Sequence, residues 1–364
     1  MRASEENIKS GGQVVCASMT TATARKAFAE AGDKPLILTT SILPKRTFCQ
    51  PEWNSCQLPG VSQEAHRESS RTRLFCRGRM FVYRPDPLSV YAPNSRPVML
   101  IKGGYNLAYD CLDYTPMIFA IHIRPEEAVN LVEPETFTVF PETSYANYVD
   151  SFGNKCTRLI APPGRFSIWN RFVIAASGLP EQLPTDAYQH AVPELPEDTL
   201  VYLLGSRYCD TQKLSALAWS IFGGYWKGWS LVKAILDYTH EGIRFSYANA
   251  YDERTAFDAH EERAGVCRDF AHLAITLCRC MNVPARYCTG YLGDIGVPAD
   301  PAPMDFSAWF EVFMGGRWWP LDARHNQPRI GRIVVARGRD AADVAISTAF
   351  GNAKLAEFKV IAEL

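Results

Sequence analysis

The sequence contains no apolar stretch near the roughly 18 residues that a membrane-spanning helix needs. Close to the N-terminus, Val14, Val15 and Cys16 form an apolar run that is far too short for a signal peptide. Basic and acidic residues almost balance, 38 against 39, so the net charge of −1 does not favour nucleic acid or a membrane surface as a partner. These absences predict a cytoplasmic protein.

Motifs of several common metal and cofactor sites are also missing. The sequence has no Gly-rich phosphate loop, no acidic loop with calcium-ligand spacing and no CxxC pair. Its eleven cysteines are odd in number and irregularly spaced, which is typical of free thiols in a reducing compartment. We therefore expect no metal and no cofactor.

Residues 1–98 differ in composition from the rest of the chain. They carry 14 Lys and Arg against 8 Asp and Glu, and they lack sustained helical or strand periodicity. Such a segment is predicted to be disordered. It is either a basic interaction arm or not part of the working protein, which would then start at Met99 or Met80; we favour the second interpretation.

The remainder predicts an α+β protein in three parts. Short strands and turns over 99–178 indicate a small β-sandwich domain, and 179–196 form a proline-rich linker. Residues 197–364 begin with helical periodicity over 214–222 and 228–240 and are expected to form a second domain.

A buried helix that starts with a cysteine follows. Apolar residues recur at helical spacing from Phe270 to Met281, and Pro284 stops the helix, so one face is expected to be buried. Cys267 lies at the N-terminus, where the helix dipole and free amides are expected to lower the pKa of the thiol. From spacing alone, a nucleophile and a structural cysteine are equally good interpretations.

Three ordered blocks resemble bacterial transglutaminase-like proteins, which have a papain-like fold. The resemblance extends from about Leu100 to the C-terminus. It implies a core in which the Cys-bearing helix packs on an antiparallel sheet, and a catalytic Cys-His-Asp triad. The blocks are Gly265-Val-Cys-Arg-Asp-Phe-Ala-His272 with the following Val283-Pro-Ala-Arg-Tyr-Cys-Thr-Gly-Tyr291, then Ala308-Trp-Phe-Glu-Val312, and Gly316-Arg-Trp-Trp-Pro-Leu-Asp-Ala323.

The sequence departs from this family pattern at the histidine. The matching positions are Cys267, Ser307 and Asp322, so a serine occupies the place of the usual base. A Gly315-Gly316 turn predicts a hairpin in which Ser307 and Asp322 are diagonal neighbours on one face. A serine hydroxyl does not titrate near neutral pH and is a poor general base.

His325 is the candidate substitute for the missing base. Strand parity would point it away from the Ser307 face, but the strand is expected to end near Ala323, so the loop could redirect it. His272 lies about 140° round the helix from Cys267 and is expected to be a structural histidine.

Three tryptophans of the predicted hairpin, Trp309, Trp318 and Trp319, could line a substrate groove, although hairpin aromatics more often pack in the core. The arginines of the C-terminal region are expected to form a solvated face rather than a site for an acidic substrate. They are Arg324, Arg329, Arg332, Arg337 and Arg339.

Two functions remain open at this point. The first is a transglutaminase-like cysteine protease, amidase or acyltransferase, a hydrolase or transferase in which Cys267 forms a thioester with a carboxamide or peptide carbonyl. The second is a pseudoenzyme that binds protein or peptide in the old cleft. Either predicts a protein or peptide partner, with no nucleic acid and no membrane.

Overall fold

The computed structural model describes residues 13–15, 98–225, 227–300 and 302–364, which all belong to one compact unit. The predictions made for residues 1–98 therefore fall, apart from the short strand β1 (Gln13–Val15) and Val98, outside the described residues. No described helix is long and apolar enough to cross a membrane.

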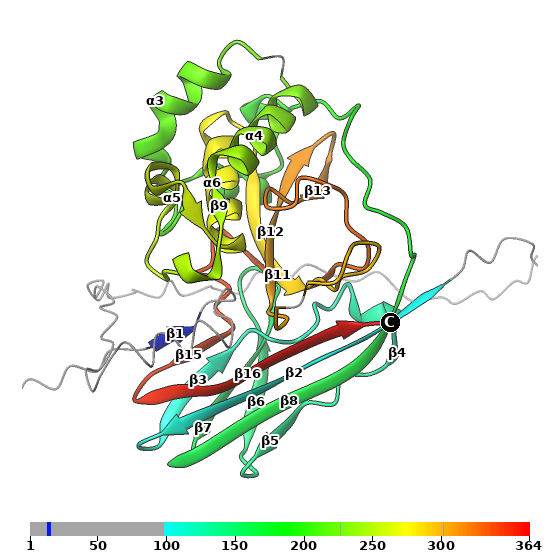
Figure 1. The fold of residues 1–364 in the computed structure, drawn as a ribbon, viewed down its shortest axis with the longest axis vertical. Helices are drawn as coiled ribbons and strands as arrows, with labels where there is room; N and C mark the ends of the chain where they lie inside the picture. Colours follow the sequence, from blue (N-terminus) through cyan, green and yellow to red (C-terminus); the bar gives the residue numbers. More distant parts are fainter. Residues whose placement is uncertain (1–12, 16–97, 226, 301) are drawn as a thin grey trace, which may run out of the picture. The chain divides into compact units, whose positions relative to one another are not determined.

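Two antiparallel sheets occupy the region predicted as an all-β domain. The first has the order β16-β2-β8-β4, with β5 also paired to β8. Figure 1 shows its three longest strands, β2, β8 and β16, running side by side. Its members are β2 (Met99–Cys111), β4 (Leu131–Glu133), β5 (Thr138–Phe140), β8 (Gly164–Ala176) and β16 (Ala353–Glu363).

The second sheet has the order β1-β15-β3-β7-β6. Alternate residues are buried in β3, β8 and most of β16, as expected of strands with one apolar face. Tyr109 of β2 meets Phe119 of β3 with ring centroids 6.0 Å apart. The remaining members are β3 (Thr115–Phe119), β6 (Tyr145–Val149), β7 (Lys155–Ala161) and β15 (Ser347–Ala349).

The predicted domain boundary at 197–364 needs correction, because the chain returns to the first region at its end. Strand β15 pairs with β3, and β16 pairs with β2 over most of its length. The pairing partner of β16 lies about 250 residues earlier, so local periodicity could show a strand but not its sheet.

The segment 179–196, predicted as a linker, is bound to its surroundings by hydrogen bonds. The amide of Glu181 donates to the carbonyl of Arg329 at 3.0 Å, and Gln189 Nε2 donates to the carbonyl of Met281 at 2.9 Å. These bonds fix the segment against the second half of the chain.

The helical part of the chain surrounds one central helix, α6 (Cys267–Cys280). Helices α3, α4 and α5 contact α6, and the predicted helices at 214–222 and 228–240 are confirmed as α3 and α4. The α-helices are α2 (Glu197–Leu200), α3 (Thr211–Phe222), α4 (Trp229–Gly242) and α5 (Ala256–Glu262), with short 3-10 turns at Ala128–Asn130, Val192–Glu194, Val201–Leu203 and Tyr247–Asn249.

A four-stranded antiparallel sheet covers the other side of α6. Its order is β13-β12-β11-β14, and α6 packs on β11 and β12 (Figure 1). The strands are β11 (Ala285–Tyr291), β12 (Ser307–Met314), β13 (Arg317–Leu321) and β14 (Ile333–Gly338); a two-residue parallel pair, β9 (Arg244–Phe245) and β10 (Ala264–Gly265), lies apart from them.

Helix α6 is buried on every side, so the expectation of a single buried face was wrong. All 14 of its residues are buried because helices lie on one side and a sheet on the other. Its polar side chains have partners inside: Arg279 donates to the carbonyl of Ala285 at 3.0 Å, and Thr276 donates to the carbonyl of His272 at 2.7 Å.

Candidate active site

Cys267 is the first residue of α6, preceded by Val266 in an extended conformation. The amide of Val266 donates a 2.9 Å hydrogen bond to Asp269 Oδ2, which fixes the start of the helix. The thiol lies against the start of the strand β12, where the backbone N–H of Ala308 donates a hydrogen bond to the sulfur. Cys267 is 8% exposed and lines a pocket of about 340 Å³.

The expectation that the helix N-terminus lowers the pKa of the Cys267 thiol was wrong. Burial raises that pKa to about 11, while the Arg324 guanidinium and the Ala308 amide oppose the shift only in part. The carboxylate of Asp269 also lies in the first turn, where its negative charge offsets the helix dipole. At neutral pH the thiol therefore needs a proton acceptor.

The hairpin that carries the other predicted site residues has the expected register. Phe310 pairs with Leu321 and Met314 with Arg317, across a turn in which Gly315 and Gly316 have φ values of 58° and 80°. Two successive positive φ values are those of a type I′ turn, which matches the twist of the flanking strands. Strand β13 ends at Leu321, so Asp322 begins the loop.

The loop after β13 turns His325 back towards Asp322. His325 Nδ1 lies 2.9 Å from Asp322 Oδ2, and the His325 amide donates to Asp322 Oδ1 at 3.0 Å. The turn is closed by the Asn326 amide, which donates to the Asp322 carbonyl at 2.8 Å, with Asn326 in the left-handed region at φ 50°. Because His325 lies in this loop and not in β13, the alternation of side chains along the strand does not set the direction of its imidazole.

Asp322 is a buried, ionised carboxylate. The hydrogen bonds from His325 and the guanidinium of Arg332, with Nη2 3.4 Å from Oδ2, outweigh burial and hold the pKa of Asp322 well below its usual range. Arg332 is itself fixed by Glu181, whose Oε1 lies 2.6 Å from Nε, and it stacks over the Trp309 ring at 4.5 Å. The carboxylate that faces His325 is thus held rigidly.

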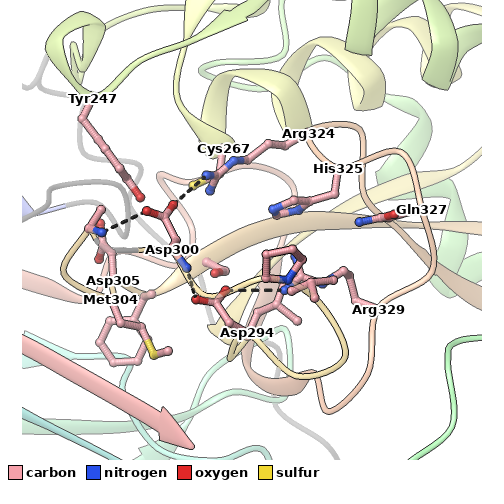
Figure 2. Close-up of a pocket in the computed structure, with 16 residues that line it drawn as sticks. Tyr247, Cys267, Asp294, Asp300, Met304, Asp305, Arg324, His325, Gln327 and Arg329 are labelled. Carbon is pink, nitrogen blue, oxygen red and sulfur yellow. Dashed lines mark hydrogen bonds and ion pairs between the residues drawn. The ribbon is translucent and has the colours of Figure 1, made fainter.

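Cys267, Ser307 and His325 line the same pocket. Figure 2 shows the sulfur of Cys267 beside the Arg324 side chain, with the His325 ring turned into the pocket next to them. Arg324 also lies 4.0 Å from Asp300, and His240 Nδ1 lies 2.9 Å from the Arg324 carbonyl oxygen. These contacts hold the loop after β13 in place. The structure brings a thiol and an imidazole to one cavity, and the carboxylate partner of the imidazole, Asp322, lies outside that cavity.

Comparison with known proteins supports a family for this arrangement. The profile of the Transglutaminase-like superfamily matches residues 216–323. A solved structure from Cytophaga hutchinsonii, named a putative cysteine protease, is 32% identical, has a TM-score of 0.62 and covers 73% of this chain and 90% of its own. This chain belongs to the transglutaminase-like superfamily.

Curated relatives match a smaller region. An uncharacterized protein of Mycobacterium leprae is 35% identical over 94 residues, which are 25% of this chain and 33% of that protein. An uncharacterized protein of Mycobacterium tuberculosis (strain H37Rv) is 41% identical over 91 residues, which are 22% of this chain and 29% of that protein. The chain thus spans about a third of the length of the curated relatives that it matches.

Within this transglutaminase-like core, the structure does not bring Trp309 or Trp319 into the Cys267 pocket. Trp309 is 1% exposed and packs with Cys288 and Val334, and its face carries Arg332. Trp319 donates from Nε1 to the Met314 carbonyl at 3.0 Å, and Arg317 stacks on its ring at 3.4 Å. Both indoles pack within the hairpin and its sheet, and neither lines the Cys267 pocket.

The C-terminal arginines are a further correction, since they do not form a solvated face. Arg329 and Arg332 are buried, Arg337 binds Glu311 and Glu126, and Arg339 binds Asp343. Arg324 stacks on Phe245 at 3.6 Å. A run of basic residues predicts solvent exposure on average, but the acidic partners of Arg332 and Arg337 include residues from distant parts of the sequence, namely Glu181, Glu126 and Glu311.

Sequence reasoning missed two residues of the transglutaminase-like site, Arg324 and Asp305. The charge of Arg324 is the largest influence that favours the thiolate of Cys267. Asp305 carries a buried carboxyl group that lines the same pocket. The sequence offered one signal for each: Arg324 directly precedes the candidate base His325, and Asp305 stands two residues before Ser307. His272 is confirmed as structural: it stacks on Tyr208, and its Nε2 accepts from the Ala341 amide at 3.2 Å.

Proposed function

We propose that this protein catalyses thiol-dependent acyl transfer or hydrolysis at a carboxamide or peptide bond, with Cys267 as nucleophile and His325 as general base. The observation that carries the proposal is the 2.9 Å contact between His325 Nδ1 and Asp322 Oδ2 at the wall of the pocket that holds Cys267. It supplies an oriented imidazole although Ser307 occupies the usual histidine position.

The Asp322 contact decides which ring nitrogen is available. An ionised Asp322 can only accept, so His325 Nδ1 carries the hydrogen and Nε2 has a free lone pair. Nε2 can then take the proton of the Cys267 thiol, and the imidazolium that forms is stabilised by the carboxylate behind it. This is the division of roles found in Cys-His-Asp triads.

Arg324 supports the charged form of the nucleophile. Its guanidinium is the largest influence lowering the pKa of Cys267. Because the thiol is buried, a fixed positive charge is only weakly screened and favours the thiolate once His325 has taken the proton. Ser307 cannot act as the general base, because its hydroxyl does not take up a proton near neutral pH. We therefore assign the base to His325 in the loop after β13.

The reaction proceeds through a thioester. The Cys267 sulfur attacks the carbonyl carbon, the C–N bond breaks, and the leaving amine takes the proton held by His325. Water or a second amine then attacks the thioester, which gives hydrolysis or amide exchange. A protein or peptide is the substrate class we propose, because such substrates carry the carboxamide or peptide carbonyl.

A second candidate function is a pseudoenzyme that binds peptide in the pocket. It is favoured by Ser307 and by the burial that raises the pKa of the thiol to about 11. Under that hypothesis His325 has no influence on Cys267.

The deciding experiment is the pH dependence of Cys267 alkylation by iodoacetamide, read by mass spectrometry of the Cys267 peptide. We expect the apparent pKa of alkylation to be higher in His325→Ala than in the wild type, because the variant lacks the group that takes the thiol proton and burial disfavours the thiolate. His260→Ala, a half-buried histidine of α5 outside the pocket, is the matched control. Identical profiles for wild type and His325→Ala would favour the pseudoenzyme.

A further inference from the structure

A second carboxyl group, Asp305, lies in the wall of the Cys267 pocket. It stands two residues before Ser307 at the entry to β12, and the side chain is 9% exposed. Its Oδ1 is shielded from solvent and has no hydrogen-bond partner among the described residues. Buried polar atoms are nearly always paired in native structures, so an unpaired one in a pocket wall points to a ligand group that completes it.

The surroundings of Asp305 favour its neutral form. Burial outweighs the Phe306 amide and the Arg324 guanidinium, and it holds the pKa of Asp305 well above the usual carboxyl range. The titratable groups that interact with it are Arg324 from the loop after β13, Cys267 from α6 and Tyr247 from the 3-10 turn at Tyr247–Asn249. Further titratable groups that line the same pocket are Asp294, Asp300, His325 and Arg329. Arg324 also lies 4.0 Å from Asp300, so the guanidinium interacts with both carboxyl groups rather than with Asp305 alone.

We propose that Asp305 is a further catalytic residue, a carboxylic acid whose O–H donates a hydrogen bond to the carbonyl oxygen of the acyl group that Cys267 attacks. The inference rests on the proposed function of Cys267 and deepens it. A neutral carboxyl beside a nucleophile is a hydrogen-bond donor and cannot act as a base, so its role is distinct from that of His325.

The step balances without a further reagent. The thiolate pair forms the S–C bond, the carbonyl π pair moves to oxygen, and the O–H of Asp305 stabilises the resulting oxyanion while keeping its proton. Collapse restores the C=O bond and expels the leaving group, which takes the proton from His325 when it is an amine. Asp305 returns to its starting state after each turnover.

Two probes separate this role from activation of the thiol. p-Nitrophenyl acetate acylates a cysteine through an oxyanion, whereas iodoacetamide alkylates it at a saturated carbon and forms none. The ratio of acylation rate to alkylation rate at Cys267 therefore reports oxyanion stabilisation with the thiolate fraction cancelled. Cys267→Ala gives the background for both reagents.

We expect Asp305→Leu, which fills the space but donates nothing, to lower this ratio about a hundredfold, the usual effect of removing one oxyanion donor. Asp305→Asn keeps an N–H donor and should lower the ratio less than about tenfold by the same reasoning. Thermal melting of each variant establishes that it is folded; if Asp305→Leu does not fold, the pH comparison below decides alone.

The pH profile supplies a second readout. In the wild type the ratio should fall as rising pH ionises Asp305, whereas in Asp305→Asn it should stay level because an amide does not ionise. A ratio in Asp305→Leu within about threefold of wild type, far short of the loss of an oxyanion donor, or parallel pH profiles for wild type and Asp305→Asn, would overturn the role of Asp305 alone. Absence of acylation above the Cys267→Ala background would overturn the proposed function with it.

Discussion

Asp305 and Asp322 occupy comparable places and have opposite charge states. Each adjoins a strand of one hairpin, Asp305 just before β12 and Asp322 just after β13, and each side chain is almost completely buried. Burial raises the pKa of Asp305 well above its usual range, yet the pKa of Asp322 lies well below it. Burial alone therefore does not determine the charge of a carboxyl group.

The difference comes from the number of donors aimed at each carboxyl. Asp322 receives two hydrogen bonds from His325 and one from Arg332, whereas Asp305 has the backbone N–H of Phe306 and a guanidinium that is shared with Asp300. Three charge-assisted or well-aligned donors offset the desolvation of a carboxylate, and one does not. Two carboxyls with separated pKa values are what a site needs to orient a base and to donate a hydrogen bond.

The largest effect is expected from Asp322→Asn. The amide cannot hold the imidazolium of His325, and its N–H group can turn the ring to the wrong tautomer. We expect Cys267 acylation by p-nitrophenyl acetate to fall by about 10³–10⁴-fold, by analogy with carboxylate removal in triads. Stopped-flow release of p-nitrophenolate measures it.

Asp110→Asn is the matched control, because Asp110 is an exposed carboxylate of β2 bound only to Arg165 at 3.0 Å among the described residues. It should leave the acylation rate within experimental error. If Asp322→Asn retained the wild-type rate, the contrast between the two buried carboxyls would have no catalytic meaning.

Local patterns were sufficient to predict much of this site. The Gly315-Gly316 pair fixed the register that places Asp322 at the end of β13, and the spacing from Phe270 to Met281 located the helix that begins at Cys267. His325 was named as a candidate because the loop after the strand could redirect it. Each of these inferences depends on residues close together in the sequence.

Features that depend on distant residues could not be predicted. The raised pKa of Cys267 follows from burial by elements that the sequence alone does not place. Arg332 contacts Glu181, about 150 residues earlier, and the pairing of β16 with β2 spans a still longer interval. Charge balance and periodicity carry no information about such partners, which is why the arginines were expected at the surface.

The next effect in size concerns Arg332, which donates a hydrogen bond to Asp322, whereas Arg324 acts on Asp305 through its charge alone. Arg332→Met would leave the buried carboxylate of Asp322 and the partly buried carboxylate of Glu181 without their shared cation. Removing one member of a buried ion pair typically costs about 3–5 kcal/mol. We expect a loss of unfolding free energy of about that size in urea denaturation at pH 7.

Arg165→Met provides the comparison for this variant. Arg165 and Asp110 are both about half exposed, and an exposed pair contributes less than about 1 kcal/mol. A similar small loss for Arg332→Met would mean that the buried network does not hold Asp322 in its ionised state. In that case the Asp322→Asn effect would need another explanation.

The smallest expected effect is a change in how stability depends on pH. A carboxyl whose folded pKa is raised contributes stability below its unfolded pKa of about 4, and that contribution is lost as pH rises towards the folded pKa, by at most about 1.4 kcal/mol per pH unit. Asp305→Asn should therefore flatten the decline of wild-type stability as pH rises above about 4 towards the raised folded pKa of Asp305. Asp322 has the opposite sign, since its depressed folded pKa contributes stability above about pH 4 that is lost on acidification. Urea titrations from acidic to alkaline pH should therefore separate the two variants, with Asp305→Asn changing the slope of stability above about pH 4 and Asp322→Asn changing it below about pH 4. Curves of the same shape for both variants would show that the two carboxyls titrate alike.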